Sequence, residues 1–436
     1  MEDLKDVNSM QEFDLHLPNE ALPIQVKQNK SVVGKISLSN FPTGSRNDYG
    51  GASNQNTEFE ITVSNSQQML LTNSAICCDV TLLNQKVPGE GVAGTKFRGG
   101  QTAFKSFSVT INNKKLVDLQ NHADKVADFH ISATNTTDQL SQLESITGYN
   151  VPISNNETIS LRIPLKWFGL EIGNLIPTGT IGTTLRINAT INTDPVSQLS
   201  RNDPVTGTKI NLKYNNFRLE SEFVELQPML LSKRIERISS STGLVIPYHT
   251  YAVDVRNLSQ ISSFNERIAL NYNNIVALYQ LPYNTEKEQP LLYTNLLWGA
   301  STGDNTINIE QVKDYLVNFD GSQYYNLNSN GGQSGKAAHA QALLNSTRCE
   351  FCPPGAGESI ISNLDTYQAL GCDFVRSNNV LSPAIIDSGV NARMQSGIIN
   401  TQCSFNTAIA ANKQLVTIIK FTRRLIMKNK SMDVFS

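Results

Sequence analysis

The chain has 436 residues, of which 39% are hydrophobic and 17% are charged, and its formal net charge is −2. This balance is enough for packed cores, but it argues against wrapping of nucleic acid by the chain as a whole, which needs a strongly basic surface. The length is too great for one ordinary β-sandwich and suits two sandwiches of about 200 residues each. Asn, Gln, Ser and Thr supply much of the polarity, and such weakly charged surfaces suit proteins that pack against their own copies.

The first residues predict where the protein is made. Residues 1–22 are acidic and lack the basic flank and apolar stretch of a signal peptide. No run of 18 apolar residues follows, so no segment is expected to span a bilayer. We therefore expect a protein made in the cytosol and not secreted. The acidic arm is either a free terminus or a segment that orders against a neighbouring subunit.

Apolar and polar residues alternate through the first half of the chain, as in half-buried antiparallel strands. Residues 118–145 break this alternation, because Leu119, Ala123 and Val126 recur at three to four and predict one or two helices. Asn112 and Asn113 predict a turn before the helical part. Strands are expected at 23–28, 31–38, 57–64, 75–84, 104–111, 157–163, 183–192 and 209–226.

A second round of strands follows Pro228, which ends the first round. We expect a helix at 309–319, within a long loop region at 282–358. The chain therefore divides into an arm at 1–22, a first unit at 23–228 and a second unit at 229–436. Strands of the second unit are expected at 233–238, 244–256, 265–271, 274–281, 371–376, 396–405 and 413–427.

The cysteines and histidines do not form a recognisable metal-binding pattern. Cys349 and Cys352 make a single Cys-x-x-Cys without the second close pair that a zinc site needs. Cys77 and Cys78 are adjacent, so on a strand their side chains leave opposite faces. We expect free, partly buried thiols and no bound metal.

Three stretches resemble catalytic motifs, and each lacks an essential part. Residues 89–94 have dinucleotide-binding letters but no good helix start after them. Residues 331–337 resemble a phosphate loop that is one residue short and has Ala337 where Ser or Thr would hold magnesium. Residues 299–303 have the spacing of a nucleophile elbow, but a turn sequence follows them. We therefore expect no catalytic residue and no cofactor, and an enzyme is the least favoured class.

The order of these features resembles the double jelly-roll major capsid proteins of the hexon-like lineage. Adenoviruses, tailless membrane-containing phages, virophages, Polinton-like elements and large DNA viruses share this family. The stretches that carry the resemblance are Phe59–Leu71, Phe107–Asp118, Ile163–Phe168 and Ile385–Arg393 with Phe405–Leu415. Family members often have Gly in the turn where this chain has Asn113.

The resemblance implies an all-β fold with short helical insertions, in which two tandem eight-stranded jelly rolls each pack two sheets face to face. Three copies would form a pseudo-hexameric homotrimer of an icosahedral virion, with penton and minor capsid proteins as further partners. The loops at 86–102 and 282–358 would lie at the outer face or between subunits.

The C-terminal end is basic and offers candidate binding residues. Its lysines and arginines would sit at the inner face of the shell, near packaged DNA or an internal membrane, or would simply protect an edge strand. The candidates are Lys420, Arg423, Arg424, Lys428 and Lys430.

Two other classes remain open for the sequence. A penton, spike or tail component of a virus would share many of these patterns, but a penton is pentameric and usually has one jelly roll. A secreted β-rich adhesin or glycan-binding protein would carry a signal peptide and a concave aromatic or acidic site.

Overall fold

The structure is a computed structural model of the full chain. It describes residues 32–43, 48–50, 58–63, 68–84, 96–134, 137–149, 151–154, 156–170, 172, 175–177, 184–192, 198–200, 210–241, 243–258, 262–272, 274–284, 312–328, 370–374, 389, 397–405, 413–429 and 431–435.

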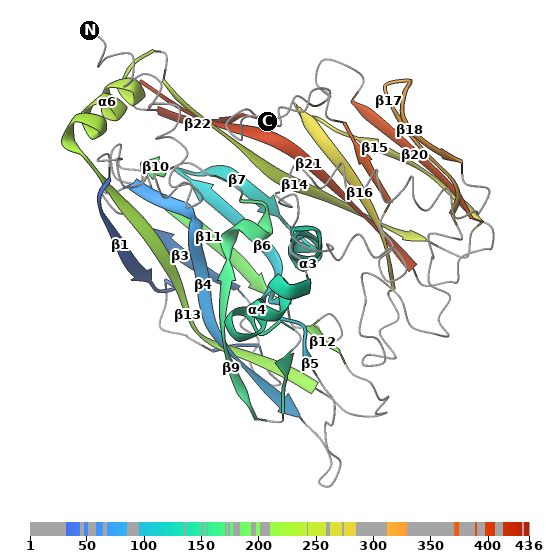
Figure 1. Ribbon diagram of the computed structural model, residues 1–436, viewed down its shortest axis with the longest axis horizontal. Coiled ribbons are helices and arrows are strands. Elements are labelled where there is room, and N and C mark those ends of the chain that lie inside the picture. The colour runs from blue at the N-terminus through green and yellow to red at the C-terminus, as the bar shows by residue number, and fades with distance from the viewer. Residues whose placement is uncertain are drawn as a thin grey trace.

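The first half of the chain forms a sandwich of two antiparallel sheets (Figure 1). One sheet contains β1 (Val32–Asn40), β13 (Ile210–Leu226), β4 (Gln68–Asn84) and β9 (Thr158–Pro164), with β2 (Asp48–Gly50) on β13 and β10 (Leu175–Pro177) on β4. The facing sheet contains, in order, β3 (Glu58–Val63), β11 (Leu185–Ile191), β6 (Phe104–Ile111) and β7 (Lys114–Leu119).

Short strands and helical elements flank this first sandwich. A small sheet contains β12 (Leu199–Ser200), β5 (Lys96–Phe97) and β8 (Val151–Pro152). The helical elements are η1 (Gly100–Thr102), α3 (Ala123–Thr134), α4 (Thr137–Thr147) and η2 (Leu165–Phe168). The helices α3 and α4 interrupt the strands between β7 and β9, where the change of period predicted them.

The second half forms another two-sheet sandwich (Figure 1). One sheet contains β14 (Leu244–Leu258), β21 (Lys413–Lys428), β16 (Ile275–Asn284) and β19 (Leu370–Asp373), with β22 (Ser431–Phe435) on β21. The other sheet contains β15 (Ser263–Ala269), β20 (Ile398–Phe405), β17 (Val312–Phe319) and β18 (Ser322–Asn328).

The two sandwiches have the same strand order. Each has eight main strands in chain order, and one sheet joins the first, eighth, third and sixth of them, as in β1-β13-β4-β9 and β14-β21-β16-β19. The other sheet joins the second, seventh, fourth and fifth, as in β3-β11-β6-β7 and β15-β20-β17-β18. This order defines a jelly roll, so the chain contains two of them in tandem, as predicted.

The connection between the jelly rolls is α6 (Pro228–Ser239), where a strand was expected at 233–238. That prediction is wrong because Leu231, Arg234 and Ile238 recur at three to four, and Arg234 and Ile238 are buried. Pro228 occupies the first turn of α6, a position in which its missing N–H costs nothing.

The helix predicted at 309–319 is also wrong, because β17 occupies this part of the chain. Tyr315, Val317 and Phe319 are buried at every second position, and this period of two decides between helix and strand. Asp320 and Gly321 both have positive φ and connect β17 to β18 in a tight hairpin. The hairpin lies inside the range 282–358, which we expected to be a long loop region.

Candidate assembly interfaces

The two jelly rolls meet along β7, the last strand of one sheet in the first sandwich. The Tyr248 hydroxyl on β14 donates a hydrogen bond to the Leu116 carbonyl, 3.0 Å away. The Arg423 guanidinium on β21 donates to the carbonyls of Lys115 and Leu116 at 3.2 and 3.1 Å. Strands of the second sandwich therefore bind the backbone of the first through directional bonds, which fix their relative position.

An ion pair extends this contact to the last strand. Lys114 Nζ on β7 lies 3.0 Å from a carboxylate oxygen of Asp433 on β22. Both side chains are about half exposed, so this pair adds little stability. It marks where β7 and β22 lie side by side.

Helix α3 belongs to the first sandwich and covers the outer face of the β14-β21-β16-β19 sheet (Figure 1). The ring of Phe129 packs on the ring of Tyr279, with centroids 4.5 Å apart. His130 Nδ1 lies 3.3 Å from the Tyr251 hydroxyl, within hydrogen-bond distance. All four side chains are buried, so the second sandwich uses α3 as one wall.

Gly169, which ends η2, allows a second close approach. Its φ is +78°, a conformation that favours glycine. A Cβ at this position would lie 2.7 Å from Tyr251 Cδ2 and 3.2 Å from the Tyr251 backbone nitrogen. The backbone of β14 therefore passes against η2 only because residue 169 has no side chain.

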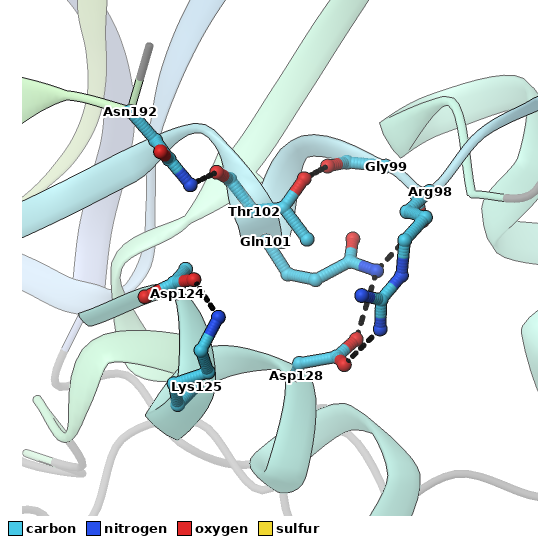
Figure 2. Close-up of polar contacts among 8 residues, drawn as sticks. All are labelled: Arg98, Gly99, Gln101, Thr102, Asp124, Lys125, Asp128 and Asn192. Carbon is cyan, nitrogen blue, oxygen red and sulfur yellow. Dashed lines mark hydrogen bonds and ion pairs between the residues drawn. The ribbon is translucent and has the colours of Figure 1, made fainter. Parts of the chain in front are cut away.

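Buried polar contacts hold α3 in place on the first sandwich (Figure 2). Arg98 and Asp128 form an ion pair at 2.5 Å, with both side chains buried. The Gln101 amide donates to the Arg98 carbonyl at 2.7 Å and to the Asp128 carboxylate at 3.3 Å. Asp124 and Lys125 also pair at 2.5 Å. Figure 2 shows Arg98 and Gln101, from the segment that contains η1, pointing toward Asp128 on α3, while the Asp124–Lys125 pair lies apart from them on the same helix.

The predicted basic residues separate into three groups. Lys420 is fully buried, with its Nζ 5.9 Å from the centroid of the Tyr251 ring, so it is not available to an external ligand in this structure. Arg423 makes the bonds to β7 described above. Arg424 and Lys428 are exposed, and Lys430 lies outside the described residues.

One end of the molecule collects α6 and the ends of several strands. Val32 at the start of β1 pairs with Leu226, two residues before α6. Asn429, after β21, donates its backbone N–H to the carbonyl of Ser240 at the end of α6. The exposed Lys428 lies at this end. Met229 on α6 is 59% exposed, so this end also presents an apolar side chain.

The cysteines that the structure describes are buried and unpaired by disulfide: Cys77, Cys78, Cys372 and Cys403. Burial is the main cause that raises the pKa of each thiol. Cys349, Cys352 and the three stretches that resemble catalytic motifs lie outside the described residues. Among the described residues, no three His, Cys, Asp or Glu side chains gather as metal ligands would.

None of the helices in the described ranges has the length and apolar character needed to cross a membrane.

No protein-family model and no curated protein matches the sequence. Solved structures do match the fold. The PBCV-1 virus capsid has a TM-score of 0.59 at 11% identity, over 93% of this chain and 97% of that chain. The Faustovirus major capsid protein has a TM-score of 0.57 at 10% identity, over 91% of each chain. A chain of the Sputnik virophage has a TM-score of 0.54 at 12% identity, over 93% and 89%.

At 10 to 12% identity these similarities establish the fold. The chain has the double jelly-roll fold of viral major capsid proteins, which is the fold that the sequence resemblance implied. The match covers nine-tenths of the chain, so both sandwiches contribute to it.

Proposed function

We propose that this protein is a major capsid protein that assembles as a pseudo-hexameric homotrimer in an icosahedral virus shell. The observation that carries the proposal is the pair of jelly rolls with one strand order, docked side by side through β7 and α3. Three such chains in a ring place six similar sandwiches around a threefold axis. A threefold ring can then occupy a sixfold position in a shell.

The mechanism is self-association and involves no chemical reaction. Lateral surfaces buried in the trimer give a stable capsomer, and weaker contacts repeated between capsomers give the shell. The protein would therefore reside in the virion and act on no substrate. Penton and minor capsid proteins would complete the shell as further partners.

The end of the molecule that carries α6 is our candidate for the inner face. Of the predicted set, Arg424 and Lys428 are exposed among the residues that the structure describes. They would face anionic groups of packaged DNA or of an internal membrane. The acidic arm at residues 1–22 leads into β1 beside α6, so we place it at the same face.

The experiment that tests the proposal is sedimentation of the purified chain with electron microscopy. We expect a particle of about 144 kDa, three times the 48.0 kDa chain, with a hexagonal outline and a threefold centre. A protein that sediments only as a monomer would contradict the proposal. A pentamer would instead favour a penton, the second candidate.

A further inference from the structure

The contact inside one chain offers a template for the contact between chains. In the second sandwich, the outer face of β14-β21-β16 is covered by the preceding sandwich, through β7 and α3. The first sandwich has the equivalent face on β1-β13-β4. On that face Ser37 and Ser39 of β1 are exposed and Glu220 of β13 is partly exposed, whereas Ala75 and Cys77 of β4 are buried. A ring of six sandwiches repeats one kind of head-to-tail contact, so this face is where the next contact belongs.

Rows of residues across the two sheets correspond. In the second sandwich, Tyr251, Lys420 and Ala277 form one row across β14, β21 and β16. In the first sandwich, Ser39, Glu220 and Ala75 form a row across β1, β13 and β4. The two rows cross strands with the same places in the jelly-roll order.

The two rows differ in exposure and in charge. Lys420 and Tyr251 are buried from the moment the chain folds. Glu220 is partly exposed and lies between two cations, with Arg218 at 3.0 Å and Arg162 at 3.6 Å. A face that must stay in water until a partner arrives carries such paired charges, because they keep it hydrated and prevent non-specific association.

An exposed aromatic residue marks the same region. Phe41 directly follows β1 and is 65% exposed, the most exposed large apolar side chain among the described residues. Large aromatic side chains are common among the residues that carry most of the binding energy of an interface. In a separate chain, Phe41 has no such partner to cover it.

We propose that the outer face of β1-β13-β4, with Phe41 at its margin, is the subunit contact of the trimer and that its occupant is the β17–β18 hairpin of a second copy. The hairpin is chosen because β18 holds the place in the second sandwich that β7 holds in the first, at the end of its sheet. Since β7 contacts β14 within the chain, β18 contacts β1 of the neighbouring copy. This inference rests on the proposed trimer and names the surfaces that form it.

The first test compares two exposed apolar side chains by analytical ultracentrifugation. We expect the Phe41→Glu variant to raise at least tenfold the protein concentration below which the trimer dissociates. A separate Ser39→Trp variant should have the same effect. Met229→Glu on α6 is the matched control and should leave the trimer unchanged. Circular dichroism and melting of each variant establish that it is folded. Folded Phe41→Glu and Ser39→Trp variants that remain trimers like the wild type would overturn the inference.

The second test uses thiols and does not depend on weakening the trimer. Ser39→Cys and Gln323→Cys are introduced together in a chain with Cys349→Ser and Cys352→Ser, and a short bismaleimide is added. Covalent species of two and three chains are expected, and a chain that carries only one of the two introduced cysteines should give none, because the four remaining native cysteines are buried. Cross-links confined to one chain, or none at all in a trimeric protein, would contradict the assignment. A wild-type monomer would instead defeat the proposed function itself.

Discussion

At the scale of single residues, Arg423 contributes most clearly to the joint between the sandwiches. Replacement by Ala removes both charge-assisted hydrogen bonds to β7 carbonyls, and only the Leu116 carbonyl keeps another donor, the Tyr248 hydroxyl. We expect the free energy of unfolding to fall by about 2 kcal/mol, measured by urea titration. Arg424→Ala, on the neighbouring exposed side chain, should change it by less than about 0.5 kcal/mol. Equal effects of the two substitutions would argue against the role of Arg423.

The Cys77 thiol gives a prediction about pH. Burial, followed by the hydrogen bond and charge of Glu220, raises the pKa of Cys77 to about 12 from 9.0. The folded protein thus holds the thiol proton more tightly than the unfolded chain, so this group costs stability as pH rises above about 9. At pH 8 iodoacetamide should label Cys77 far more slowly in the folded than in the urea-unfolded protein. Glu220→Gln should lower the pKa and speed labelling, and an unchanged rate would show that the carboxylate has no part in it.

At the scale of elements, the β6–β7 turn shapes the strand that the second sandwich binds. Asn112 and Asn113 have φ of 46° and 64°, which fits the turn type that matches the twist of a two-residue hairpin. Asn113→Ala should lower the free energy of unfolding by about 1 kcal/mol, because Ala adopts this left-handed backbone conformation less readily than Asn, whose polar side chain can hydrogen-bond locally. Asn113→Gly should be close to neutral. Thermal melting of the two variants would reveal the order, and an Ala variant as stable as the Gly variant would exclude backbone strain as the cause.

Local patterns explain which elements could be predicted from the sequence. Alternation located most strands within a few residues, as for β6, because one face of each is buried. The period of three to four likewise located α3. The same logic failed over β17, where Val312, Tyr315 and Phe319 fit a helix while Tyr315, Val317 and Phe319 fit a strand. The Asp320-Gly321 pair that follows was the signal that could have decided it.

The joint itself could not be found in this way. Arg423 and Leu116 are 307 residues apart in the chain, and no pattern within a window of sequence connects them. The basic run at the C-terminal end suggested a shared surface, yet Lys420 is buried while Arg424 is exposed. Alternation predicts that neighbouring strand residues point to opposite faces, but not that a second domain covers one of those faces.

At the scale of the whole molecule, the two sandwiches should unfold together. One hydrophobic cluster includes buried residues of both, and α3 covers a sheet of the other sandwich. A chain with Trp298→Phe keeps Trp167, in the first sandwich, as its single tryptophan. Leu278→Ala, in the core of the second sandwich, should then lower the free energy of unfolding that Trp167 fluorescence reports by about 2–5 kcal/mol. The midpoint of unfolding from Trp167 fluorescence should coincide with the midpoint from circular dichroism. Two separate transitions would show that the sandwiches unfold independently.

The burial of Tyr279 and Tyr251 against α3 also has a consequence for translation. Ribosomes deliver the first sandwich before the second, and domains generally fold in the order in which they emerge. The surface that covers the later sheet is therefore already present when that sheet leaves the exit tunnel. A gene with its two halves exchanged would release this sheet face first, before the chain contains the surface that covers it, and would leave it open to chaperones and other nascent chains.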